Sequence, residues 1–197
     1  MTNFAVEKSA DEKEFSWRTI SSHEHIVHIY EDEESLLDVL EQFIVGGLSK
    51  GESVVVVATA EHLAEMNERL NAYNVDAAHL RRHYICLEAE EALSRFLIDG
   101  FPDARLFNEF VDGILDKAEQ GGRRVRVFGE MVAVLWKAGN SRATIKLEQL
   151  WNNFCHTGAF PLLCAYPKGG FNSRSASIKE ICAAHSKVIS SLDWLAY

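Results

Sequence analysis

Four short apolar runs in the sequence each end at residues that could bind a small ligand. A phenol, a hydroxyl, an imidazole or a carboxylate can donate or accept hydrogen bonds. If the runs are neighbouring parallel strands, the residues that follow them meet at one edge of the sheet, where open α/β sheets bind ligands. We therefore predict a ligand crevice formed by Tyr30, Glu31, Thr59, His62, Gly129, Glu130, Trp136 and Tyr166.

The turn from Ala58 to His62 tests whether this ligand is a nucleotide. A phosphate-binding loop needs glycines that turn backbone N–H groups towards phosphates and a lysine that neutralises them. The turn has neither, and Glu61 would add negative charge. We predict that no functional phosphate loop exists, although the helix start could still bind a carboxylate or a neutral carbonyl.

Gly129 and Glu130 resemble the acidic end of a strand that holds magnesium in nucleotide-hydrolysing enzymes. Without a phosphate loop this role has no substrate. Two interpretations of Glu130 remain: an acid stabilised by the dipole of the next helix, or an acceptor of hydrogen bonds from a small ligand. Gly129 is expected to permit a sharp turn. The two tyrosines, Tyr30 and Tyr166, are expected to form an aromatic wall of the crevice with hydroxyl groups available.

Evidence for metal or catalytic chemistry is weak. On a strand His23 and His25 share one face while His28 lies on the other, so the three cannot converge. The acidic run 31–34 is better explained by a helix dipole than by a cation site. Cys86 and Cys164 lie within strands, His62 and His185 are isolated, and no Gly-x-Ser-x-Gly turn is present. We expect no metal, no cofactor and no enzymatic activity.

The pattern of apolar residues predicts alternating strands and helices. Predicted strands cover residues 25–30, 53–58, 84–87, 125–128 and 162–166, and helices follow at about 33–50, 60–70, 89–97, 104–120, 131–138, 141–156 and 175–184. The unbroken β-branched run of residues 53–58 is typical of a strand covered on both faces. The fold class is therefore α/β, with three layers and a mainly parallel sheet of about five or more strands.

Composition sets further limits. The chain has 197 residues, which fits one domain, predicted here as residues 23–190 between a flexible arm (1–22) and a tail (191–197). A net charge of -9 disfavours direct nucleic-acid binding. No export signal or apolar run long enough to span a membrane is visible, and the four cysteines are widely spaced. We expect a soluble cytoplasmic protein with reduced, mostly buried thiols.

Several segments, taken in order, resemble the MEDS domain, the methanogen/methylotroph DcmR-type sensory domain. They are residues 25–32, 51–59, 127–136 with 139–140, 147–152 and 163–167, and the likeness spans about residues 23–190. The resemblance implies a diverged relative of the RecA and KaiC ATPase fold, like that of P-loop NTPases but without a functional P-loop. It also implies an input module of bacterial and archaeal signalling that senses small organic compounds such as halogenated or methylated hydrocarbons.

Three functions follow as hypotheses. The first is a non-enzymatic sensor that binds a small organic ligand and acts through a partner protein such as a kinase or transcription regulator, since the chain has no recognisable DNA-binding or kinase segment. The second is a residual nucleotide-binding or ATPase domain. The third is an adaptor whose crevice is packed shut by Tyr30, Tyr166 and Trp136. A homodimer is possible.

Overall fold

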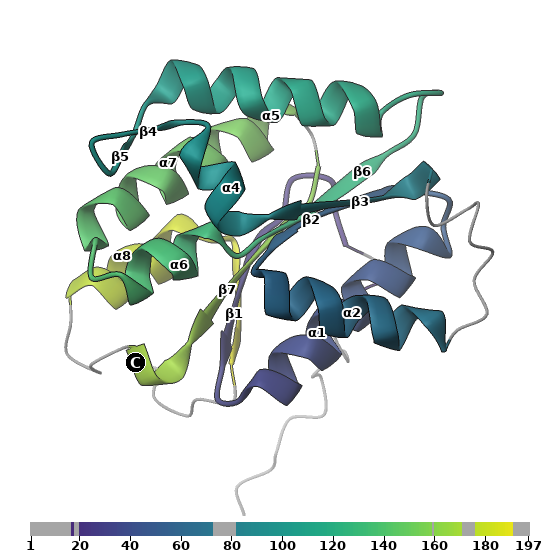
Figure 1. Cartoon of the computed structure of the whole chain (residues 1–197), viewed down its shortest axis with the longest axis horizontal. Coiled ribbons are helices and arrows are strands. Elements are labelled where there is room, and N and C mark those ends of the chain that lie inside the picture. Colours follow the sequence, from purple (N-terminus) through teal and green to yellow (C-terminus); the bar gives the residue numbers. More distant parts are fainter. Residues whose placement is uncertain (1–16, 18–19, 73–81, 159, 171–175, 191–197) are drawn as a thin grey trace, which may run out of the picture.

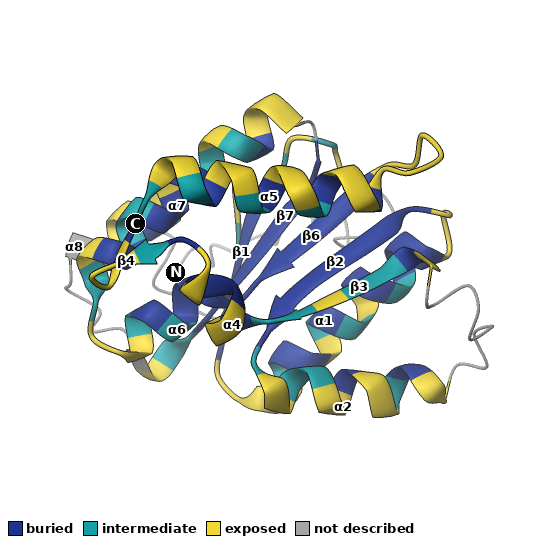
Figure 2. Cartoon of the chain, turned by 45° about the horizontal axis from the view of Figure 1, so that its top comes forward, coloured by how far each residue is buried: buried dark blue, intermediate teal, exposed yellow. Residues whose placement is uncertain are grey.

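A computed structural model describes residues 17, 20–72, 82–158, 160–170 and 176–190. One parallel sheet lies between two layers of helices (Figure 1). Helices α1 and α2 cover one face, and the helices from α4 to α8 cover the other. The predicted three-layer α/β fold is confirmed, because both faces of the central strands are buried (Figure 2), as the β-branched run at residues 53–58 indicates.

The sheet has six described strands in the order β3-β2-β6-β7-β1-β8, and every pairing is parallel. The strands are β1 (His25–Tyr30), β2 (Ser53–Ala58), β3 (Tyr84–Glu88), β6 (Val125–Gly129), β7 (Leu162–Pro167) and β8 (Lys187–Ser190). Five of them agree with the predicted strands to within one residue. Edge strand β8 was not predicted, and it pairs with β1 through residues 187–190.

The helices also follow the predicted order. Their bounds are α1 (Glu33–Leu48), α2 (Ala60–Asn71), α4 (Ala89–Ser94), α5 (Ala104–Ala118), α6 (Met131–Lys137), α7 (Ser141–Gly158) and α8 (Ala176–Ala184), with a short 3₁₀ turn at Lys168–Gly170. Side-chain caps begin the helices nearest the sheet edge. Asp32 accepts from the Ser35 N–H at 2.8 Å, and Thr59 accepts from the His62 N–H at 3.4 Å.

Two further features were not predicted. The break expected at residues 100–103 belongs to a small antiparallel hairpin of β4 (Leu97–Ile98) and β5 (Phe101–Pro102). Trp17, within the predicted arm, is buried against Phe43 with ring centroids 5.6 Å apart. The rest of the arm up to residue 19, and the predicted tail 191–197, lie outside the described residues.

None of the helices in the described ranges combines the length and apolar character needed to cross a bilayer.

Candidate functional site

A crevice of about 580 Å³ lies where β1, β2, β6 and β7 end. This is the carboxyl edge of the sheet, where the sequence predicts a ligand site. The crevice brings together five of the eight predicted residues: Tyr30, Thr59, His62, Glu130 and Trp136. Their positions follow from the parallel topology, because the residues after each strand must reach the same edge.

Glu130 is the central polar residue of the crevice. It follows β6, and its backbone N–H donates to the Val57 carbonyl at 2.8 Å, which joins the ends of β6 and β2. Its carboxylate accepts from the Thr59 backbone N–H at 2.9 Å, and its side chain does not cap α6. The dipole that Glu130 meets is therefore that of α2, not that of its own helix. Only 3% of the residue is exposed.

His62 connects Glu130 to a second carboxylate. One ring nitrogen, Nδ1, lies 2.8 and 2.9 Å from the two oxygens of Glu130, and Nε2 lies 2.7 Å from Oε2 of Glu33. Carboxylate oxygens only accept, so both nitrogens are satisfied when the ring carries two protons. The hydrogen bond with Glu130 chiefly raises the pKa of His62, to about 9, against the opposing effect of burial. His62 is thus an imidazolium that ties α1, α2 and the start of α6 together.

The crevice has an acidic charge balance. Glu33, Glu61 and Glu130 line it, against two cationic side chains, His62 and Lys137. The balance is one negative charge at neutral pH. Such a surface disfavours phosphate groups and suits a neutral or cationic molecule.

Aromatic residues supply the apolar part of the crevice. Tyr30 is almost fully buried at the end of β1, while Trp136 is partly exposed on α6. Burial raises the pKa of Tyr30, and the carboxylates of Glu33 and Glu130 raise it further. Tyr30 therefore stays neutral and can offer its hydroxyl group to a ligand.

Three predicted site residues do not line the crevice. Glu31 is exposed, and its carboxylate lies 2.5 Å from the Lys168 ammonium group. Gly129 is a buried strand residue without positive φ, so the abrupt change from β6 to α6 does not use the conformational freedom of a glycine. The side chain of Tyr166 lies under the α6–α7 layer, where its hydroxyl donates to Glu148.

Other crevice residues were missed by sequence reasoning. They are Glu33, Glu61, Ala133, Val134, Lys137 and Pro167. The helical period places Ala133 on the same face as Trp136, three residues later, but it does not indicate Val134 or Lys137. Nothing in the sequence indicates that Glu33, rather than its acidic neighbours, reaches His62.

A comparison with protein families matches residues 24–186 to the MEDS model, described as the methanogen/methylotroph, DcmR sensory domain. The chain belongs to the MEDS family. The MEDS match includes every strand of the crevice and the three helices, α1, α2 and α6, that His62 and its two carboxylate partners join. A comparison with curated proteins gives no match. The MEDS assignment makes this chain a member of a sensory-domain family, as the sequence resemblance implies.

Proposed function

We propose that this MEDS domain is a non-enzymatic sensor that binds a small organic molecule in the crevice and signals through a partner protein. The observation that carries the proposal is the His62 bridge. One imidazolium at the crevice wall joins Glu33 on α1 to Glu130 at the start of α6. A ligand that binds Glu33, Glu130 or His62 would compete with these hydrogen bonds and so weaken the connection between α1 and α6.

The chemistry of the crevice favours a neutral or cationic ligand with one apolar side. Tyr30 and Trp136 present aromatic surface, and Thr59, His62 and Glu130 supply polar groups. This combination of apolar lining and a few polar groups is typical of small-molecule sites. Small methylated or halogenated compounds, which the likeness to the MEDS family suggests, carry no phosphate charge and fit this chemistry. Signal output requires that the ligand bind one arrangement of the helices more tightly than another.

The same geometry disfavours a residual nucleotide site with a P-loop-like phosphate position. The Glu130 carboxylate already accepts from the Thr59 N–H at the start of α2, where a phosphate would bind. Glu61 adds a second negative charge beside it. A pure adaptor role is disfavoured because the crevice is open, with about 580 Å³ of space rather than a packed aromatic plug.

Thermal unfolding against a panel of ligands tests the proposal. The purified chain is heated with chlorinated, methylated and aromatic compounds, and separately with magnesium-ATP. A ligand at about 100 times its Kd stabilises by about 2.7 kcal/mol and raises the midpoint by roughly 5–10 °C in a domain of this size. Trp136→Leu should abolish the shift, because it removes the aromatic wall.

Phe101→Leu is the matched control, since Phe101 is an exposed aromatic residue on β5, outside the crevice. A shift that persists in Trp136→Leu would place the ligand elsewhere. A shift with magnesium-ATP alone would contradict the sensor proposal in favour of nucleotide binding. No shift across the panel would favour the adaptor. The partner, a kinase or transcription regulator, is then sought by comparing complexes formed with and without the active compound.

A further inference from the structure

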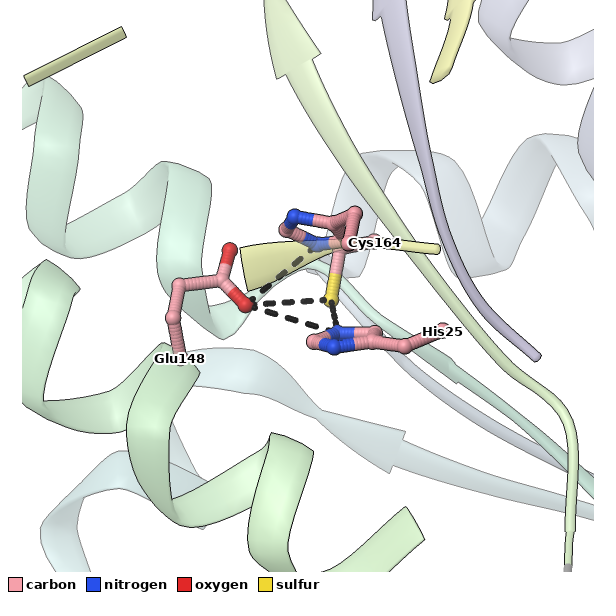
Figure 3. A group of neighbouring side chains, drawn as sticks. His25, Glu148 and Cys164 are labelled. Atoms are coloured by element: carbon pink, nitrogen blue, oxygen red, sulfur yellow. Dashed lines mark hydrogen bonds and ion pairs between the residues drawn. The ribbon is translucent and has the colours of Figure 1, made fainter. Parts of the chain in front are cut away.

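A second group of reactive side chains is buried away from the crevice, among β1, β7, α7 and the turn after α8. Its members are His25, Glu148, Cys164 and His185, and Figure 3 shows the first three pointing towards one another. Their four ligand atoms all lie within 4.8 Å of one another, and all four residues are buried. His25 and Cys164 meet because they lie on the same face of the paired strands β1 and β7.

Four of the six distances between these ligand atoms match those of a tetrahedral metal site. His25 Nε2 lies 3.4 Å from Cys164 Sγ and 3.5 Å from Glu148 Oε2. His185 Nε2 lies 3.5 Å from the same Glu148 oxygen, and Cys164 Sγ lies 3.8 Å from it. Zinc bonds of about 2.0–2.3 Å place tetrahedral ligand atoms about 3.3–3.8 Å apart.

The hydrogen bonds of His185 leave a lone pair aimed at the centre of this group. Its Nδ1 lies 2.6 Å from the Ile181 carbonyl oxygen, which only accepts, so Nδ1 must carry the proton. In the neutral ring Nε2 is then an unprotonated acceptor. It has no hydrogen-bond partner, is fully buried, and faces the carboxylate of Glu148. Two acceptors in this position need either a proton or a metal ion between them. A backbone carbonyl that fixes the outer nitrogen is also the usual support of a metal-bound histidine.

Glu148 is held in the same way. Its Oε1 accepts from the Tyr166 hydroxyl, which leaves Oε2 as the oxygen that faces His25, Cys164 and His185. When Cys164 releases its proton on metal binding, its thiolate and the Glu148 carboxylate together carry two negative charges, which a divalent ion balances in this buried site. We propose that His25, Glu148, Cys164 and His185 bind one divalent metal ion of the zinc class.

The proposal departs from the expectation that the chain holds no metal, and it is independent of the sensory ligand. Mixed nitrogen, sulfur and oxygen ligands favour zinc over magnesium or calcium, and four protein ligands are typical of structural zinc sites. The ion would enter through a groove of about 550 Å³ between α7 and α8, whose lining includes Glu148. Once bound, it would join the turn after α8 to the centre of the sheet.

Metal titration of the purified full chain tests the site. The protein is stripped with a chelator and titrated with Zn²⁺ against a competing chromophoric chelator, without any organic compound present. We expect one ion per chain, and at least tenfold weaker binding in Cys164→Ser and His185→Gln. Cys155→Ser is the matched control, because Cys155 is a buried thiol that contacts the Phe160 carbonyl rather than this group. It should bind Zn²⁺ as the unmodified chain does.

Cobalt substitution gives a second readout, the first part of which uses the unmodified chain alone. Co²⁺ in the unmodified chain should show the intense visible bands of tetrahedral coordination and a thiolate-to-cobalt charge-transfer band. The charge-transfer band should persist in Cys155→Ser and disappear in Cys164→Ser. The proposal is overturned if the chain binds no stoichiometric Zn²⁺, if bound Co²⁺ lacks the thiolate band, or if Cys164→Ser leaves zinc affinity unchanged. Because no crevice ligand is used, these outcomes are separate from those of the sensor test.

Discussion

His62 shows how a single residue acquires its properties from three distant parts of the chain. Alone, it is a histidine at a helix start with an ordinary pKa of 6.5. The fold places a carboxylate on each ring nitrogen and raises the pKa to about 9. Sequence reasoning identified His62 and Glu130 by their place after strands, but not the pairing that controls their charge.

This pairing predicts a pH dependence of stability. Because the folded-state pKa exceeds the unfolded one, the stabilisation is fully present below about pH 6.5 and is lost as the pH rises through about 9. Because Glu33 is exposed and its interaction with His62 is screened by solvent, we expect the loss in the free energy of unfolding to be about 2 kcal/mol. Urea unfolding from about pH 6 to about pH 10 should show this loss in the unmodified chain, and His62→Gln should lack it.

His156→Gln provides the control, since His156 is an exposed histidine in the last turn of α7. It should keep the pH profile of the unmodified chain. If His62→Gln lost stability over the same range as the unmodified chain, the bridge would not carry the charge assigned to it.

At the scale of elements, two glycines allow the end of α1 to pack closely against the sheet. Gly46 and Gly47 let the last turn of the helix approach Arg126 of β6, which is buried and donates to Glu52 Oε2 at 2.7 Å and to the Phe43 carbonyl at 2.9 Å. Burial lowers the pKa of Arg126, and the Glu52 carboxylate opposes that effect. Because Arg126 is buried, it needs all of these partners, and the α1 carbonyl reaches it only if the helix lies this close to β6. A buried charge without its partners is costly.

Replacing Gly47 by alanine tests the approach. A Cβ there would lie 2.6 Å from Arg126 Nε and 2.8 Å from Val54 Cγ2, so the helix or the ion pair must shift. We expect a loss of about 1–3 kcal/mol in the free energy of unfolding. Gly113→Ala in α5 is the matched control, because a Cβ there meets nothing within 4 Å. It should instead stabilise by about 0.5–1 kcal/mol through helix propensity. Equal effects in chemical denaturation would contradict this packing argument.

For the whole molecule, the layers and five strands could be predicted because unbroken apolar runs alternate with helical periods. Strand β8 could not, since a run of four residues has too little pattern and forms by pairing with β1. The crevice residues that directly follow strands could be predicted, because parallel strands end at the same edge of the sheet. The buried group was not, because its four ligands stand at positions 25, 148, 164 and 185, with no spacing that indicates a metal site.

Tyr166 lies between the two proposed sites. Its hydroxyl donates to Glu148, and its ring packs edge-on against Trp136 of the crevice, with centroids 6.4 Å apart. Tyr166→Phe keeps the ring and removes the donor, so we expect zinc affinity to fall about 10–100-fold, as for other residues that support a metal ligand. The organic ligand should still stabilise the metal-free variant. Competition titration and thermal unfolding of the same sample measure the two effects, and unchanged zinc affinity would contradict the role of the hydroxyl.

A residue that touches both sites makes their binding equilibria subject to thermodynamic linkage. If the metal changes the affinity of the crevice by some factor, the crevice ligand must change the affinity for the metal by the same factor. The response of the domain would then depend on both concentrations rather than on one. A cell depleted of the metal would respond to the organic compound at a different threshold from a replete cell, with no change in the crevice itself.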